Sequence, residues 1–133
     1  MRSPKDDATV PAKKITDDPS LYRRVAKIIR WRDGDTVEVE IDQGFDDAKY
    51  MALRLRGINC QELDEADGER ALNFSHLLCP PDSQRIIQVY RKTSGRYETT
   101  WDRYAADITM PDGTQLADQL IAAGLGVIDS RRY

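Results

Sequence analysis

Alternating apolar and polar residues dominate the first half of the chain and predict β-strands. In the clearest run, Val37, Val39 and Ile41 are separated by polar residues, as the period of two along a half-buried strand requires. Runs rich in β-branched and apolar residues predict five strands in all, over 22–31, 36–41, 50–58, 85–91 and 103–110. The Asp33-Gly34 pair predicts a tight hairpin turn between the first two strands, because glycine accepts a positive φ.

Two further segments carry apolar residues at the spacing of a helix. The first, 64–78, has an apolar stripe and ends before two consecutive prolines, through which a helix cannot continue. The second, 114–123, has Thr114 as a suitable N-cap and Gly124 as a suitable residue just past its end. Both segments are therefore predicted to be α-helices.

The predicted order is three strands, a helix, two strands and a helix, with polar loops over 42–49 and 93–100. This order matches a five-stranded OB-fold β-barrel with two helices, a mainly β fold of the α+β class. Composition alone also permits other α+β arrangements. Residues 22–133 are predicted to form one domain. Residues 1–21 are polar and contain three prolines, which predicts an N-terminal arm or flexible tail.

The chain of 133 residues carries a formal net charge of -3 at pH 7, with a pI near 5.2. This balance argues against a broad electrostatic surface for nucleic acid, although a few local cations can still hold one phosphate. Mean hydropathy is -0.64, and no apolar run reaches the roughly 18–20 residues of a membrane-spanning helix. No signal-like apolar stretch follows the N-terminus, so we expect an intracellular, cytoplasmic monomer without membrane contact, unless a leader has been removed.

Cys60 and Cys79 are the only cysteines, and His76 is the only histidine. Two cysteines allow at most one disulfide, and without a sign of secretion two free thiols are the better interpretation. Their spacing does not match a zinc site. A catalytic Cys60 thiolate would need His76 as its partner, and nothing in the sequence brings the two together.

Residues with the chemistry for phosphate binding concentrate in the segment Arg-Leu-Arg-Gly-Ile-Asn-Cys-Gln-Glu at 54–62. An Asp-Gly-Asp-Thr string at 33–36 precedes it, and a further arginine follows at a distance. Two guanidinium groups, a glutamate and a pair of Asp/Asn oxygens can together bind a hard cation and a phosphodiester. The plain alternatives are that Asp33 and Asp35 only frame a turn and that Glu62 is one of several solvated acids.

In this order and spacing, these segments resemble the staphylococcal nuclease (thermonuclease) family over about residues 22–128. The resemblance implies an OB-fold barrel and a Ca²⁺-dependent endonuclease. Such a hydrolase cleaves the 5′ O–P bond of DNA or RNA and leaves 3′-phosphates. Single-stranded or denatured DNA and RNA are the expected partners, because a flexible backbone enters the site more readily. The third, C-terminal helix of the family has no counterpart among the predicted elements.

The resemblance also implies one weakly bound Ca²⁺ ion. Asp35 is its expected carboxylate ligand, Asn59 stands where the family commonly has aspartate, and Cys60 contributes its backbone carbonyl. An amide oxygen can bind Ca²⁺ but brings no charge, so the affinity should be lower than usual. Asp33 and Thr36 are expected to support these ligands, with Asp33 acting through water.

Three side chains are the expected catalytic residues. By resemblance, Glu62 is the general base, and Arg54 and Arg103 stabilise the charge on the phosphate. The motif spacing selects Arg54 rather than its neighbour Arg56. Trp101 falls where the family has an aromatic residue near the substrate and could stack a base.

A non-catalytic OB module that binds nucleic acid or protein is the alternative function. The acidic pI and Asn59 favour this alternative. Gln61 favours it too, because it replaces the family's usual proline and leaves the loop before Glu62 less rigid. Retention of Arg54, Glu62 and Arg103 favours the enzyme.

Overall fold

The computed structural model describes residues 18–90, 97, 99–100 and 103–129. Trp101 and most of the predicted N-terminal arm lie outside these described residues. The strands are β1 (Arg23–Trp31), β2 (Thr36–Gly44), β3 (Asp47–Leu55), β4 (Ile58–Cys60), β5 (Gln84–Val89), β6 (Thr99–Thr100), β7 (Arg103–Thr109) and β8 (Gly126–Ile128). The helices are the 3-10 helix η2 (Pro19–Tyr22) and the α-helices α2 (Gly68–Leu78) and α3 (Leu116–Ala122).

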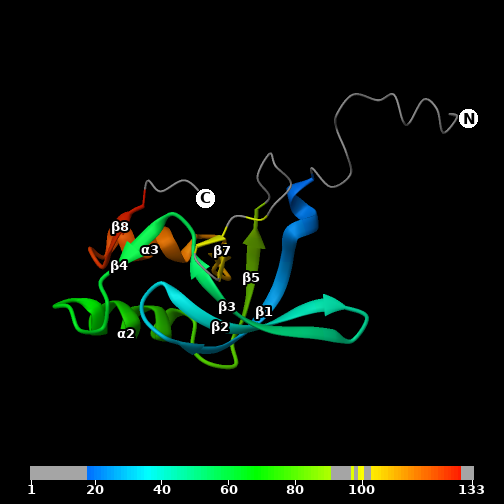
Figure 1. Cartoon of the computed structure of the whole chain (residues 1–133), viewed down its shortest axis with the longest axis horizontal. Helices are drawn as coiled ribbons and strands as arrows, with labels where there is room; N and C mark the ends of the chain where they lie inside the picture. Colours follow the sequence, from blue (N-terminus) through cyan, green and yellow to red (C-terminus); the bar gives the residue numbers. More distant parts are fainter. Residues whose placement is uncertain (1–17, 91–96, 98, 101–102, 130–133) are drawn as a thin grey trace, which may run out of the picture.

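Five strands close into a barrel (Figure 1). Neighbours in the order β3-β2-β1-β5-β7 pair in antiparallel fashion, and a parallel pairing of β3 with β7 closes the barrel. The helix α2 contacts α3 and β1, and α3 also packs against β7. The predicted OB-like, mainly β architecture with two helices is therefore confirmed.

The hairpin of β2 and β3 is longer than the sequence predicted. The predicted loop over 42–49 is wrong, because β2 continues to Gly44 and β3 begins at Asp47. Gly44, Phe45 and Asp46 have positive φ and form the turn. The ribbon extends beyond the barrel (Figure 1), and both of its faces are exposed there. No alternation of apolar residues therefore marks it as a strand.

The connection from β1 to β2 is not the tight turn that the Asp33-Gly34 pair predicted. Gly34 is not among the residues with positive φ. A Cβ atom on Gly34 would lie 2.6 Å from the Cβ of Ala71 in α2, so glycine is needed here for close packing. The Ser75 hydroxyl also donates to the carbonyl of Gly34 at 2.8 Å. Helix α2 therefore fixes the loop that precedes β2.

Both α-helices start later than predicted. α2 begins at Gly68, because the residues before it form turns. α3 begins at Leu116, because the Thr114 amide and hydroxyl instead donate to the Asp112 carboxylate at 3.0 and 2.6 Å. The predicted end at Gly124 is confirmed by its φ of 74°. Neither described α-helix is long and apolar enough to cross a membrane.

The third predicted strand, 50–58, is split in two. Gly57 has a φ of 76°, and after it the chain leaves the barrel as β4 and pairs with β8. The sequence did not predict β8, or β6 within the expected loop 93–100. These strands have two or three residues, which is too short for a periodic pattern to appear.

The core fills the inside of the barrel. Ile28, Val39, Leu53, Ile87 and Ile108 are among its fully buried members. Burying one such side chain contributes about 1.5–3 kcal/mol. The alternation predicted for β2 is confirmed, because its apolar residues face this core.

Candidate active site

A buried ion pair between Asp35 and Arg54 forms the centre of the candidate site. Asp35 lies just before β2, and Arg54 lies opposite Thr36 in the register of β2 with β3. The Nη1 atom of Arg54 contacts Oδ2 of Asp35, and the two side chains are 12% and 4% exposed. The β2–β3 pairing therefore brings together two charges that the sequence places in separate motifs.

The same guanidinium group reaches β4. Nη2 of Arg54 donates to the carbonyl of Ile58 at 3.2 Å and to Oδ1 of Asn59. Arg54 therefore bridges Asp35 and Asn59, the two side chains predicted to ligate a metal ion.

Both carboxylate oxygens of Asp35 accept further hydrogen bonds. Oδ2 accepts the backbone N–H of Cys60 at 2.8 Å, and Oδ1 accepts the hydroxyl of Thr36 at 3.4 Å. A buried charge is tolerated only where it is paired and hydrogen-bonded, and this condition is met here. We call this cluster the polar corner, which comprises Asp33, Asp35, Thr36, Arg54, Asn59 and Cys60.

Asp33 lies at the edge of the polar corner. Its Oδ1 accepts the backbone N–H of Asp35 at 3.0 Å. Burial raises the pKa of Asp33 to about 6, together with the side chain of Asp35 and the negative charge of Glu62. Asp33 is therefore the carboxyl group of the polar corner whose charged form is disfavoured, mainly by burial.

Glu62 is exposed and belongs to the loop before α2. Its backbone N–H donates to Oε1 of Glu65 at 2.8 Å, and the N–H of Glu65 donates to its carbonyl at 2.9 Å. A Cβ atom on Gly68 would lie 1.7 Å from that carbonyl oxygen, so glycine lets the helix approach. Gln61 Oε1 accepts the N–H of Asp67 at 2.6 Å. These hydrogen bonds hold the loop in place, although Gln61 stands where staphylococcal nucleases usually have proline.

Both cysteines are free thiols, as predicted. Burial raises the pKa of Cys60 to about 12, and the charges of Asp35 and Asp33 act in the same direction. The thiol is therefore protonated at neutral pH, which argues against a catalytic thiolate. His76 is exposed on α2. The contribution of Cys60 to the polar corner is its backbone N–H.

The arginines singled out in the sequence have different surroundings. Arg103 begins β7, and the parallel register of β7 with β3 places it on the same face of the barrel as Arg54. The guanidinium carbon of Arg56 instead lies 4.1 Å from the centroid of the Tyr90 ring. Of the two neighbouring arginines in this motif, Arg54 contacts Asp35 and Asn59, and Arg56 contacts the Tyr90 ring.

A second buried acid, Glu38, lies on the outer face of the barrel and was not predicted from the sequence. Glu38 accepts hydrogen bonds from Nε of Arg30 and Arg32 at 2.5 and 3.0 Å. These bonds lower the pKa of Glu38 below its ordinary value. Arg30 and Arg32 are two residues apart, and both reach Glu38 although Arg32 lies just past the end of β1. This spacing opposite a glutamate was the signal that could have predicted the cluster.

The polar corner suits a hard cation by donor type. Asp35 supplies a carboxylate and Asn59 an amide oxygen, both of which Ca²⁺ accepts. Within the part of the chain that the structure describes, no group of three or more His, Cys, Asp and Glu side chains is arranged to hold a metal ion. Arg54 also contacts both oxygen donors. An ion here would therefore require Arg54 to move and would complete its ligand set from backbone, water and substrate.

No protein-family model matches this chain, and no curated protein matches it. The likeness to staphylococcal nucleases therefore depends on the motif residues and on the OB-like barrel.

Proposed function

We propose that the protein is a Ca²⁺-dependent nuclease that hydrolyses phosphodiester bonds of DNA or RNA. The observation that carries the proposal is the bridge that Arg54 makes between Asp35 and Asn59. Glu62 is exposed in the loop that follows β4, and its negative charge contributes to the raised pKa of Asp33. A guanidinium group, hard oxygen donors and a nearby base are the groups that phosphodiester hydrolysis uses.

Asp35, Asn59 and the backbone carbonyl of Cys60 would hold the ion. When bound, Ca²⁺ supplies positive charge that stabilises the phosphate oxygens and makes the attacking water more acidic. These side chains provide one formal negative charge, so the ion should bind weakly without substrate. A substrate phosphate also gives Arg54 an anionic partner in place of Asp35.

The remaining chemistry falls to three side chains. Arg54 and Arg103 would bind the non-bridging oxygens of the scissile phosphate, where negative charge spreads in the transition state. Glu62 would take a proton from the attacking water. The water oxygen bonds to phosphorus as the bond from phosphorus to the 5′ oxygen breaks, and that oxygen receives the proton. The products are a 3′-phosphate and a 5′-hydroxyl.

Unpaired strands are the preferred substrates in this proposal. Asp35 and Arg54 are largely buried, and a flexible backbone can bend a phosphate towards such a pair. The net charge of -3 supports contact with a few phosphates rather than a long duplex surface.

A catalytically weak or inactive OB module that binds nucleic acid or protein is the second candidate. The observation in its favour is the ion pair itself, which engages the predicted metal ligand Asp35 with the predicted phosphate ligand Arg54. Buried pairs can serve only to satisfy their own charges. The two candidates therefore differ in whether Ca²⁺ and substrate separate this pair.

Cleavage of heat-denatured DNA in Ca²⁺ against EGTA tests the proposal. Wild-type protein should cleave only with Ca²⁺, and Glu62→Gln should lower turnover by about 10²–10⁴-fold. Asp64→Asn is the matched control, because it removes an exposed charge from the same loop and should leave turnover near the wild-type value. Filter binding should show that Glu62→Gln still binds the strand. Wild-type binding without cleavage above the Glu62→Gln level would decide for the binding module.

Asn59→Asp tests the assignment of the ion. A second carboxylate should lower the Ca²⁺ concentration for half-maximal cleavage on the order of tenfold. Calorimetry with a nucleotide present gives the Ca²⁺ affinity of both forms independently of cleavage. Absence of Ca²⁺ binding in both forms would remove the metal from the proposal.

A further inference from the structure

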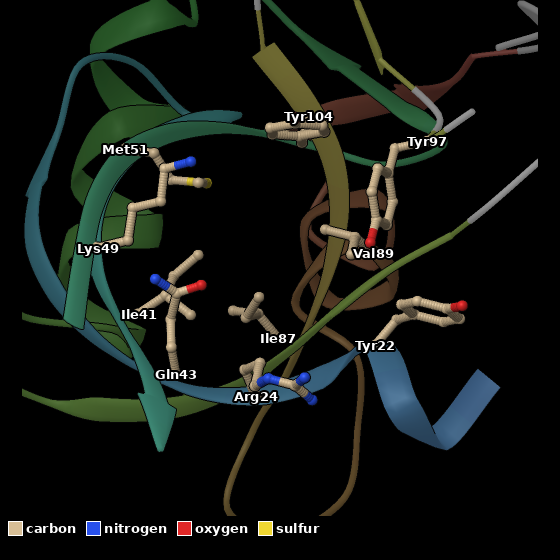
Figure 2. Close-up of a pocket in the computed structure, with 10 residues that line it drawn as sticks. All are labelled: Tyr22, Arg24, Ile41, Gln43, Lys49, Met51, Ile87, Val89, Tyr97 and Tyr104. Atoms are coloured by element: carbon tan, nitrogen blue, oxygen red, sulfur yellow. The ribbon is translucent and has the colours of Figure 1, made fainter. Parts of the chain in front are cut away.

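The end of the barrel that faces away from β4 and β8 contains a cavity of about 180 Å³. We call this cavity the barrel mouth (Figure 2). The lining residues that matter for its chemistry are Arg24, Ile41, Lys49, Met51, Ile87 and Tyr104. Arg24 pairs with Ile87, and Lys49 pairs with Ile41. Both cations therefore extend from the inner face of the barrel at its rim.

An aromatic row forms one side of the barrel mouth. The ring of Tyr97 packs edge-to-face against Tyr22 and Tyr104, with centroid distances of 5.8 and 5.5 Å and interplanar angles of 81° and 86°. Figure 2 shows the Tyr104 ring lying across the top of the hollow. Edge-to-face contacts hold such rings in fixed orientations, so Tyr104 offers a preformed surface on which a planar ring can stack.

Among the described residues, the charged side chains that line the barrel mouth are positive. They are Arg24 and Lys49, and no described Asp or Glu lines it, although the whole chain carries a net charge of -3. Nη1 of Arg24 donates to the carbonyls of Leu21 and Arg23 at 2.5 and 2.9 Å, which fixes this guanidinium at the rim. The mouth therefore favours a ligand whose apolar part enters and whose anionic part stays outside.

The size of the cavity limits the part that enters. An apolar cavity of roughly 150 Å³ is large enough for benzene, whereas pockets for drug-sized ligands start at roughly 300 Å³. A cavity of about 180 Å³ therefore accepts one small ring. Aliphatic side chains such as Ile41 and Ile87 provide its apolar walls, and Tyr104 provides the stacking face.

We propose that the barrel mouth binds a pyrimidine base of a single strand, with a neighbouring phosphate on Arg24 and Lys49. The inference deepens the proposed nuclease function by adding a base subsite to its phosphate site. Arg103 and Tyr104 are consecutive in β7, so their side chains point to opposite faces of the wall. A phosphate at Arg103 and a base against Tyr104 would therefore lie on the two sides of the same strand.

Titration with uridine 5′-monophosphate in EGTA, followed by amide NMR signals, tests the base subsite without any cleavage. The nucleotide should shift signals around the barrel mouth saturably and bind more tightly than uridine or ribose 5-phosphate alone. Arg24→Glu should weaken binding about tenfold or more. Arg23→Glu should leave the affinity near the wild-type value. It is the matched control, because Arg23 is the neighbouring residue on the outer face and bonds to Gln88.

Tyr104 provides a second pair of variants. Tyr104→Phe keeps the stacking face and should retain binding, whereas Tyr104→Leu should weaken it on the order of ten- to a hundredfold.

NMR shifts confined to the polar corner and insensitive to Arg24→Glu would overturn the base subsite and leave the nuclease proposal standing. Binding of the nucleotide at the barrel mouth, without Ca²⁺-dependent cleavage of DNA, would support the base subsite and contradict the nuclease proposal. Tighter binding of octanoate than of the nucleotide at the mouth would also overturn the inference.

Discussion

The polar corner lies at the open end of the β2–β3 hairpin, and the barrel mouth is lined by residues further along it. The two regions hold their charges in different ways. In the polar corner, Asp35 and Arg54 are buried and satisfy each other. At the barrel mouth, Arg24 and Lys49 are exposed, and no carboxylate is among the lining residues that the structure describes. A buried charge is costly unless a group of the protein pairs with it, whereas water stabilises a charge at an exposed rim and leaves it accessible to a ligand. Binding of an ion or a phosphate in the corner would therefore require Arg54 to move, whereas the cavity at the mouth is already open.

The largest expected difference between the two regions is in stability. Arg54→Ala should lower the free energy of unfolding by about 3–5 kcal/mol, because it leaves the charge of Asp35 buried and unpaired. Lys49→Ala should change it by less than about 0.5 kcal/mol, since Lys49 is exposed. Denaturant unfolding at pH 7 measures both. The double variant Asp35→Ala/Arg54→Ala should recover part of the loss. Equal losses of stability in Arg54→Ala and Lys49→Ala would contradict this difference between the polar corner and the barrel mouth.

The packing of α2 against the loop of Gly34 gives the next effect. Gly34→Ala should cost about 1–3 kcal/mol, because the new methyl group would overlap the side chain of Ala71. Ala71→Gly removes that methyl group and serves as the rescue. Thermal unfolding of both single variants and the double variant measures their interaction. The double variant should lose less stability than the sum of the losses of the two single variants. Additive losses would show that the loop does not pack against α2.

The acid at the edge of the corner predicts a dependence on pH. The pKa of Asp33 is raised to about 6 from 3.8, so the folded state holds this proton more tightly than the unfolded state. Its contribution to stability is complete below pH 3.8 and is lost as the pH rises towards 6, by about 1–2 kcal/mol allowing for solvent screening. Unfolding at several pH values should show this fall relative to Asp33→Asn. Parallel pH profiles for the two proteins would contradict it.

The smallest expected effect concerns Cys60. Its thiol pKa of about 12 means that almost no thiolate exists at pH 7.5, so alkylation by iodoacetamide should be slower than in the urea-unfolded chain. Mass spectrometry of the labelled protein measures this rate. Cys60→Ala should leave cleavage of denatured DNA almost unchanged, because the backbone of this residue serves the corner. Loss of cleavage in Cys60→Ala would restore the thiolate hypothesis.

Regular periodicity made much of the fold predictable. The alternation of Val37, Val39 and Ile41 and the helical spacing in 64–78 both correspond to elements of the structure. The ends of β2 and β3 were missed because both faces of the ribbon are exposed. The short strand β8 was missed because its partner, β4, is far away in the sequence.

The candidate site was predictable as a set of residue types but not as a set of contacts. The motifs named Asp35, Arg54 and Asn59, and the structure brings all three together. That Arg54 pairs with the predicted metal ligand could not be read from the motifs, since it depends on the β2–β3 register and on the path of β4. The roles of Glu62 and Arg103 stay predictions.

The sequence by itself determined the strand and helix pattern, the mainly β class and the polar residues of the motifs, because these depend on local periodicity and residue chemistry. Tertiary structure alone decided why Gly34 is glycine, which arginine reaches Asp35, and that Tyr22, Tyr97 and Tyr104 meet at one rim. Each of these features depends on the distance between segments remote in sequence. Such distances are set by strand pairing and close packing, which no local pattern encodes.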